Sequence, residues 1–483
     1  MKVVDVVDER VGDGLEALVC SHHARRLRRL GWGEVLSPGP SGDAADTWAA
    51  GTAVRTGNDV RVLVDGDEAF SAMVEAIRSA RSHVHVACWH ATPEFQMCRG
   101  PGGTTLRDLL ASAAQRVPVR VLMWAGPPVP LFEPTRRQAK AACAGLSQGT
   151  NVRCVLDSRE RTMHCHHEKI VMVDDDTAFV GGLDFTALQG DRLDGSDHSA
   201  ERDLGWHDVA TLLHGPVVAD VAQHFRQRWI EISGEELPQP PVPPAAGSTA
   251  VQLVRTVPEK TYEFAPRGEF TILDTYLRAL RSARSLIYLE NQFLWSPEIT
   301  EVLLDKLSNP PSEEFRLVLL LPQRPSNGSD TTRGQLGRLL DADDGNGRLL
   351  ATSISTHDGE QSAMVYVHAK VGIVDDAWMT IGSANLNEHS LFNDTEVNVV
   401  IRDDPLIRRT RLRLWSEHLQ RPESEFAGHP TEVVDSLWRP IAEDQAERSR
   451  QGRQRTHRLT MLPGVSKRVE RLNGPLRGLL VDG

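Results

Sequence analysis

The feature that most constrains this chain is a pattern that its sequence contains twice. Each copy has His-x-Lys, an Asp five residues after the Lys, and an Asp or Asn ten residues after that Asp. These positions are His167, Lys169, Asp174 and Asp184 in the first copy, and His368, Lys370, Asp375 and Asn385 in the second. A single His-x-Lys carries no information, but two copies at a constant offset of 201 residues are hard to obtain by chance.

A second duplication extends the repeat beyond the motif. Residues 76–82 and 279–285 differ at one position, at an offset of 203. A repeat of about two hundred residues is too long for a solenoid unit and predicts two homologous lobes. Five prolines in 238–244 indicate a stiff connector between them. The predicted division is an N-terminal extension (1–58), a first lobe (59–237), a Pro-rich linker (238–248), a second lobe (249–419) and a C-terminal extension with a basic tail (420–483).

Strand-like and helix-like segments alternate within each lobe. In the first lobe, strands are expected at 60–64, 83–89, 119–124 and 152–156, and helices at 69–80, 106–116 and 136–146. The second lobe repeats this order with 270–283, 286–290, 299–306 and 316–321. Strands separated by helices predict an α/β fold with a largely parallel or mixed sheet. We therefore expect two α/β-sandwich lobes with the active site at their interface.

The two motifs lie on strand-like sequence, so that residues two apart share a face. His167 and Lys169 are expected to point the same way, as are His368 and Lys370. The motif aspartates Asp174 and Asp375 have the opposite parity and begin polar turns, which favours a structural role for them. The small residues at 181–182 and 382–383, Ser383 among them, are expected to leave room for a substrate phosphate, and the Asp184 and Asn385 side chains to add polar contacts.

Paired His and Lys residues suit phosphodiester chemistry. Lysines can hold the phosphoryl oxygens as charge grows, one neutral His can attack phosphorus, and a protonated His can give its proton to the departing oxygen. Each His needs a carboxylate to fix its tautomer. Asp208 and Glu396, each downstream of one motif, are the candidates for this role.

With these residues in place, the chain resembles the phospholipase D superfamily over about residues 59–419, and is most similar to its phospholipase and phosphatidyltransferase members. The segments Trp-His-Asp-Val at 206–209, Glu-Asn-Gln-Phe at 290–293 and Asp-Thr-Glu-Val at 394–397 add to the likeness. The resemblance implies a metal-independent reaction through a phosphohistidine, without a cofactor, in which water or an alcohol is the acceptor. It also implies that His167 is the nucleophile and His368 the acid/base; the near-symmetric sequence alone does not choose between them.

Three alternatives remain open at this point: a cardiolipin synthase-like phosphatidyltransferase, a nuclease or other phosphodiesterase of the same superfamily, and a scaffold that has lost catalysis. The net charge of −12 disfavours a nucleic-acid partner. Small nucleases of the superfamily carry one motif per chain and dimerise, whereas this chain carries both, so a monomer is expected. The intact motif residues in both copies disfavour the scaffold.

Composition sets the expected compartment. The sequence has no apolar run long enough for a membrane span and no signal-like start. We expect a cytoplasmic protein, peripheral at a membrane surface where its phospholipid substrate lies. The six cysteines are expected to be free thiols. His164, Cys165, His166 and His167 crowd together but lack a second half-site, so no metal is expected there.

Overall fold

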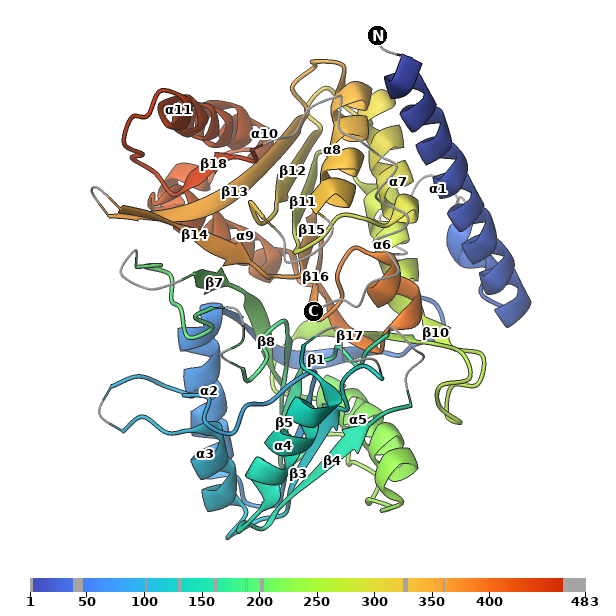
Figure 1. The fold of residues 1–483 in the computed structure, drawn as a ribbon, viewed down its shortest axis with the longest axis vertical. Helices are drawn as coiled ribbons and strands as arrows, with labels where there is room; N and C mark the ends of the chain where they lie inside the picture. The colour runs from blue at the N-terminus through green and yellow to red at the C-terminus, as the bar shows by residue number, and fades with distance from the viewer. Residues whose placement is uncertain are drawn as a thin grey trace.

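A computed structural model describes residues 3–37, 47–100, 102–128, 133–159, 164–186, 188, 190–199, 204–324, 329–358 and 361–463. The chain forms two lobes, one in the lower and one in the upper half of Figure 1. The end of the predicted basic tail, residues 464–483, lies outside these described residues. Among the described helices, none combines the length and the apolar character that a bilayer crossing requires.

The first lobe is built on one mixed sheet. Its strands are β1 (Val54–Val64), β2 (Val84–Cys88), β3 (Val119–Trp124), β4 (Val152–Asp157), β5 (Ile170–Val173), β6 (Thr177–Gly181), β7 (Gly205–His207) and β8 (Val209–His214). The order across the sheet is β1–β8–β6–β5–β2–β3–β4, with β2, β3 and β4 parallel and the other pairs antiparallel.

Helices cover both faces of this sheet. They are α2 (Asp65–Ser79), α3 (Leu106–Ala113), α4 (Arg136–Ser147) and α5 (Val217–Ser233). Alternate residues of β5 enter different cores, because neighbouring side chains of a strand point to opposite faces. Ile170 and Met172 pack in the core that contains α5, whereas Val171 and Val173 pack in the core that contains α2, α3 and α4. The lobe is therefore an α/β sandwich, as the sequence predicts.

The second lobe repeats this plan. Its strands are β9 (Thr249–Val257), β10 (Glu269–Phe270), β11 (Leu286–Glu290), β12 (Arg316–Leu320), β13 (Leu349–Asp358), β14 (Gln361–Val367), β15 (Val371–Val374), β16 (Trp378–Gly382), β17 (Glu396–Arg402) and β18 (Leu459–Met461). The sheet order β9–β17–β16–β15–β11–β12–β13 matches that of the first lobe strand for strand, and β18 extends its edge.

Helices of the second lobe follow the same arrangement, with additions at both ends of the chain. They are α6 (Thr271–Ser282), α7 (Pro297–Ser308), α8 (Ser329–Asp343), α9 (Asp404–Leu419), α10 (Pro430–Val433) and α11 (Arg439–Arg450), with short helices η1 (Gly33–Leu36), η3 (His389–Asn393), η4 (Glu423–Phe426) and η5 (Val434–Trp438). The N-terminal helix α1 (Val3–Leu30) precedes the first lobe in sequence but packs on the second, beside α7 (Figure 1). Leu27 and Leu30 enter the core that contains α6 and α7.

The two lobes are joined by strand pairing as well as by side chains. β1 pairs with β9, with Val54 opposite Gln252, so the two sheets are continuous. β7 of the first lobe runs parallel to β14 of the second, which brings His207 opposite Val367. A matching bridge joins His166 to Thr395. Through these two contacts, the residue that precedes each motif histidine pairs with a strand or segment of the opposite lobe.

Candidate active site

Both motif histidines lie on the wall of one pocket between the lobes. The pocket is lined by Trp89, His167, Asp184, Leu188, Arg192, Trp206, Gln292 and His368. His167 and His368 are largely buried, at 4% and 5% exposure. The prediction that the two motifs meet in one cleft of one chain is therefore confirmed.

The motif histidines sit just ahead of β5 and β15 rather than within them. Each strand begins three residues after its histidine, at Ile170 and Val371. The backbone N–H of His167 donates to the Thr395 carbonyl at 3.0 Å, and that of His368 donates to the His207 carbonyl at 2.8 Å. Backbone pairing with the other lobe thus fixes the position of each histidine.

His167 is held by a carboxylate of the second lobe. Its Nδ1 lies 3.0 Å from Glu396 Oε1 and 3.1 Å from the Ser383 carbonyl. Glu396 is fully buried and accepts hydrogen bonds from the hydroxyls of Ser390 and Ser383. With Nδ1 engaged, Nε2 is the ring nitrogen left for the pocket, and Ser383 serves to orient Glu396.

His368 is held by a carboxylate of the first lobe. Its Nδ1 lies 2.6 Å from Asp208 Oδ2, and Asp208 Oδ1 accepts the Val209 N–H at 2.8 Å. Burial raises the pKa of Asp208 to about 6. Burial, and then the neighbouring cations Lys370 and Arg192, hold the pKa of His368 well below its usual value. In the ligand-free pocket His368 is therefore neutral at neutral pH, and a bound anion would offset the cations that disfavour its proton.

The two motif lysines are placed alike. Lys169 Nζ donates to the His167 carbonyl at 2.6 Å, and Lys370 Nζ donates to the His368 carbonyl. Lys169 also pairs with Asp184 Oδ2 at 3.1 Å, whereas Lys370 lies 3.3 Å from the amide oxygen of Gln292. Each lysine thus contacts the backbone of its own histidine, although neither lysine is among the described residues that line the pocket.

The two remaining motif positions also hold the site together. Asp184 Oδ1 accepts the backbone N–H groups of Trp89 and His90. Asn385 is the equivalent residue of the second repeat, and its Nδ2 lies 3.4 Å from the amide oxygen of Gln292, which also contacts Lys370. Asp184 thus contacts the lysine of its repeat directly, whereas Asn385 contacts a partner of its lysine. Among the described lining residues, Asp184 is the sole carboxylate, and its pairing with Lys169 leaves no set of ligands for a divalent ion in the pocket.

The motif aspartates Asp174 and Asp375 do not reach the pocket. The Asp174 carboxylate accepts the backbone N–H groups of residues 81–83, and the Asp375 carboxylate accepts those of residues 284–286. Both residues begin tight turns with positive φ, at 59° and 51°. They fix the start of β2 and β11 and belong to the structural part of the motif.

The expectation that the small motif residues leave room for a phosphate is wrong. A Cβ added at Gly182 would lie 2.1 Å from the Asp208 carboxylate, and one at Gly382 would lie 2.2 Å from the Asn398 side chain. At Gly181 the space is taken by Ala210. These glycines permit the close approach of the neighbouring strand, which at Gly182 carries Asp208 across to His368.

Arg192 is a pocket residue that the sequence did not suggest. The residue is 6% exposed, and its guanidinium lies over Trp206, 3.7 Å from the ring centroid. Its Nε and Nη1 are buried without a hydrogen-bond partner among the described residues. The Trp206 ring in turn lies against the His368 ring, with the centroids 4.6 Å apart and the planes tilted by 51°. A buried cation with two unsatisfied nitrogens, in the pocket that both histidines line, is suited to an anionic ligand.

Two further lining residues were within reach of sequence reasoning. Trp206 and Gln292 belong to segments that the resemblance already singled out, and Gln292 Nε2 donates to the Tyr366 hydroxyl at 2.9 Å. Arg192 lies in an irregular loop and has no counterpart in the second repeat, where Asn393 stands at the same offset. No repeat or motif signal marked it.

Comparison with known proteins finds similar sequences. Residues 276–416 match the family described as cardiolipin synthase, PLD-like domain. The chain is 27% identical to phospholipase D A of Dictyostelium discoideum over 454 residues, which cover 74% of this chain and 35% of that protein. It is 26% identical to phospholipase D alpha 1 of Zea mays over 555 residues, covering 78% and 68%.

A solved structure supports the fold. Phosphatidylserine synthase of Haemophilus influenzae Rd KW20 superposes with a TM-score of 0.52 at 12% identity, covering 81% of this chain and 93% of that one. The protein is thus built from two homologous α/β lobes. Each repeat contributes a histidine and a lysine at the interface between the lobes. The chain is similar to members of the phospholipase D superfamily. It spans about a third of the length of the Dictyostelium relative.

Proposed function

We propose that this protein is a phosphodiesterase of the phospholipase D type, which cleaves the headgroup from glycerophospholipids or transfers the phosphatidyl group to an alcohol. The observation that carries the proposal is the pair of crossed dyads, His167 with Glu396 and His368 with Asp208, which face one pocket. Two histidines with fixed tautomers supply the nucleophile and the acid that phosphodiester cleavage needs.

The first half-reaction forms a covalent intermediate. Nε2 of neutral His167 attacks phosphorus, and its Nδ1–H is stabilised by Glu396 as the ring becomes positively charged. Protonated His368 gives its Nε2 proton to the departing headgroup oxygen as the P–O bond breaks. Arg192 and the lysines offset the charge of the phosphoryl oxygens, and Arg192 is available because its own guanidinium lacks a protein partner at two nitrogens.

The second half-reaction returns the enzyme to its starting state. Neutral His368 takes a proton from water or from an alcohol, whose oxygen attacks phosphorus while the P–N bond to His167 breaks. Water gives the phosphatidic acid, and an alcohol gives a new diester. The same chemistry serves both outcomes, so the balance between them depends on which acceptor reaches the pocket.

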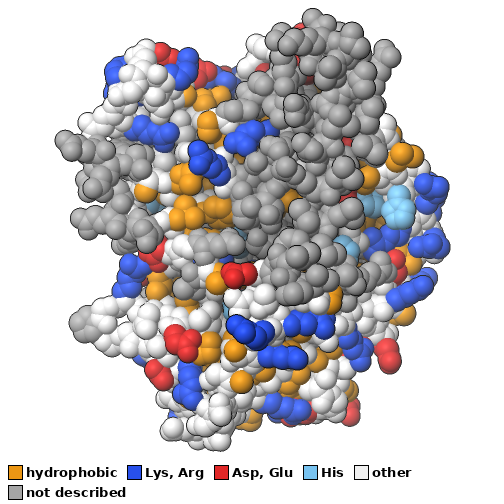
Figure 2. Space-filling view, in the orientation of Figure 1, with side chains coloured by type: hydrophobic (Ala, Val, Ile, Leu, Met, Phe, Trp, Pro, Cys, Tyr) orange, Lys and Arg blue, Asp and Glu red, His pale blue; other side chains and the backbone are white. Residues whose placement is uncertain are grey.

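The substrate class rests on the relatives. Two similar proteins are named phospholipase D, and the matched family is described as cardiolipin synthase, PLD-like domain. Phospholipid at a membrane surface is thus the proposed partner. The net charge of −12 does not exclude local basic patches, and Figure 2 shows a group of Lys and Arg side chains near the middle of the lower lobe, with Asp and Glu side chains beside it.

Headgroup release tests the proposal. The protein is incubated with mixed phospholipid vesicles and a little ethanol, beside DNA and a soluble phosphodiester, and His167→Asn serves as the inactive control. We expect phosphatidic acid and phosphatidylethanol from the wild type and neither from the variant. Cleavage of DNA alone would assign the nuclease alternative, and a new diester without phosphatidic acid would favour a dedicated transferase such as a cardiolipin synthase.

A further inference from the structure

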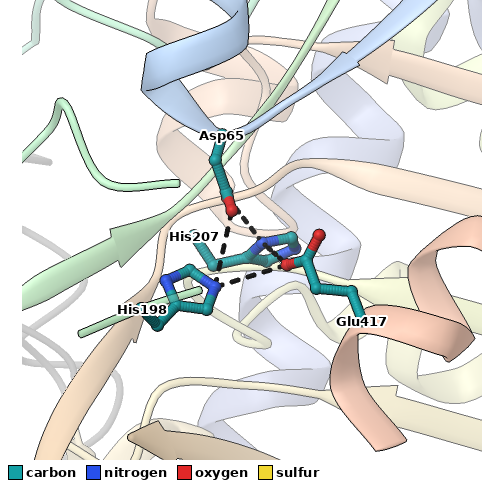
Figure 3. A group of neighbouring side chains, drawn as sticks. All are labelled: Asp65, His198, His207 and Glu417. Carbon is teal, nitrogen blue, oxygen red and sulfur yellow. Dashed lines mark hydrogen bonds and ion pairs between the residues drawn. The ribbon is translucent and has the colours of Figure 1, made fainter. Parts of the chain in front are cut away.

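A second cluster of histidines and carboxylates lies behind the active site. Asp65 at the start of α2, His198 in the loop before β7, His207 at the end of β7 and Glu417 in α9 converge on one point (Figure 3). One ligand atom from each lies within 4.8 Å of all the others. Three belong to the first lobe and Glu417 to the second, and none of the four lines the pocket.

The spacing of these atoms matches a tetrahedral metal site. His198 Nε2 lies 3.3 Å from Glu417 Oε1 and 3.5 Å from Asp65 Oδ2. His207 Nδ1 lies 3.4 Å from the same Glu417 oxygen. Metal–ligand bonds of about 2.0–2.1 Å in a tetrahedron give edges of about 3.3–3.4 Å. Three of the measured edges therefore have the length that four ligands around one ion would have.

The ring nitrogens of both histidines that face away from the cluster also have partners of the kind found at metal sites. Ligating histidines usually donate their other ring N–H to a carboxylate. His198 Nδ1 lies 2.7 Å from Asp194 Oδ2, and His207 Nε2 lies 2.9 Å from Glu290 Oε2. Glu290 is held in turn by His418 Nε2 at 2.9 Å. Each ring thus presents its other nitrogen to the centre of the cluster.

An independent observation points to a missing ligand. Asp65 is fully buried, and its Oδ2, which faces His198, has no hydrogen-bond partner among the described residues. Its Oδ1 is already engaged by the Asp208 N–H at 3.2 Å and by His207 Nδ1 at 2.9 Å. A fully buried carboxylate oxygen that has an ion-pair contact of 3.5 Å with His198 but no hydrogen bond among the described residues is left under-satisfied, and a bound cation would complete its contacts.

We propose that Asp65, His198, His207 and Glu417 bind a divalent transition-metal ion, of which Zn²⁺ fits best. On binding, His207 would release the Nδ1 proton that it shares with Asp65, so that two neutral imidazoles and two carboxylates neutralise the 2+ charge. A closed tetrahedral set of nitrogen and oxygen ligands suits Zn²⁺. The ion would be structural, because four protein ligands fill its coordination, three of them buried and the fourth, Glu417, with a side chain only 6% exposed.

The position of the ion gives it a role in the architecture of the active site. It would tie Glu417 of the second lobe to three residues of the first. His207 directly precedes Asp208, and its carbonyl accepts the backbone N–H of His368. The ion would therefore hold the segment that carries Asp208 without taking part in the chemistry at phosphorus. This inference is independent of which phosphodiester is cleaved.

Metal content provides the test. The full chain, purified without a metal-binding tag, is analysed for Zn, Fe, Mn, Cu and Ni by mass spectrometry of the elements. Wild type and His429→Gln, a control at a partly exposed histidine outside the cluster, are expected to hold about one Zn²⁺ per chain. His198→Gln and Glu417→Gln are each expected to lose more than about four-fifths of it. Metal retained in both cluster variants would overturn the assignment.

A second measurement decides the case if the variants fail to fold. Wild-type protein is unfolded in guanidinium with a chelator and refolded with Zn²⁺ or without added metal. We expect a higher unfolding midpoint with Zn²⁺, and Zn K-edge absorption with ligands at about 2.0 Å that include histidine. Equal midpoints and no bound metal would show that hydrogen bonds between histidines and carboxylates hold the cluster together without a metal ion.

Discussion

His368 Nδ1 lies 2.6 Å from Asp208 Oδ2, although the two residues belong to different lobes. The reverse pairing joins His167 of the first lobe to Glu396 of the second. Because each histidine takes its carboxylate from the opposite lobe, neither lobe contains a complete dyad. The active site therefore depends on the junction of the two repeats, and its two halves can be perturbed separately.

Loss of either carboxylate is expected to impair turnover more than binding. Asp208→Asn and Glu396→Gln each remove the group that fixes a histidine tautomer, so kcat should fall by about 10²–10⁴-fold while KM changes by about threefold or less. Steady-state kinetics on a soluble diester measure both constants. Asp176→Asn, at an exposed carboxylate outside the site, is the matched control and should behave as wild type. A loss in kcat of roughly threefold or less in both variants would contradict the dyads.

Removal of either motif histidine is expected to abolish turnover without unfolding the protein. His167→Asn and His368→Asn should lower kcat by about 10³-fold or more, because one removes the nucleophile and the other the acid. Thermal melts by circular dichroism check the fold. His214→Asn, at a histidine that contacts Thr177 outside the pocket, controls for loss of an imidazole. Full activity in either motif variant would rule out the two-histidine mechanism.

The pH dependence distinguishes the roles of the two histidines. Burial, and then the cations Lys370 and Arg192, hold the pKa of His368 well below its usual value, so His368 of the free enzyme takes up its proton only in that low pH range. An acid must carry its proton, and kcat/KM reports on the free enzyme. If His368 is the acid, kcat/KM on a soluble diester should fall as the pH rises through this range, below the usual histidine pKa. A rise of kcat/KM through the same range would instead assign His368 as the nucleophile.

Replacement of Arg192 is expected to weaken the binding of anions. Arg192→Met removes a buried cation that has two nitrogens without partners, so KM for the diester and the inhibition constant of inorganic phosphate should rise about tenfold or more. The melting temperature should stay unchanged or increase, because an unpaired buried charge opposes folding. Inhibition assays and thermal melts measure these effects. Unchanged phosphate inhibition would show that Arg192 does not contact the phosphoryl group.

Much of the architecture could be predicted because the repeat is visible in the sequence itself. Local patterns placed the segments from β1 to β4 in the first lobe and from α6 to β12 in the second, and each motif lysine contacts the backbone of its own histidine. Asp208 and Glu396 were also predicted as carboxylate partners. Which histidine each one serves could not be predicted, since the crossing depends on β7 pairing with β14 and on the bridge between His166 and Thr395.

Other features depend on tertiary contacts that no local pattern records. Gly182 looked like space for a ligand, but the space is filled by Asp208 from the neighbouring strand segment. Arg192 has no counterpart in the second repeat and lies in an irregular loop, so only the fold reveals that it lies over Trp206 beside His368. The cluster around His198 and His207 likewise draws on segments more than two hundred residues apart in the sequence.

A burst experiment on the His368→Asn variant tests the central claim most directly. A diester with a nitrophenol leaving group needs no acid, so attack by His167 should proceed while the second step stalls for want of a base. We predict release of about one nitrophenol per active site, followed by mass spectrometry that locates the phosphoryl group on His167. No burst, or a phosphoryl group found on His368 of the wild type, would contradict the account.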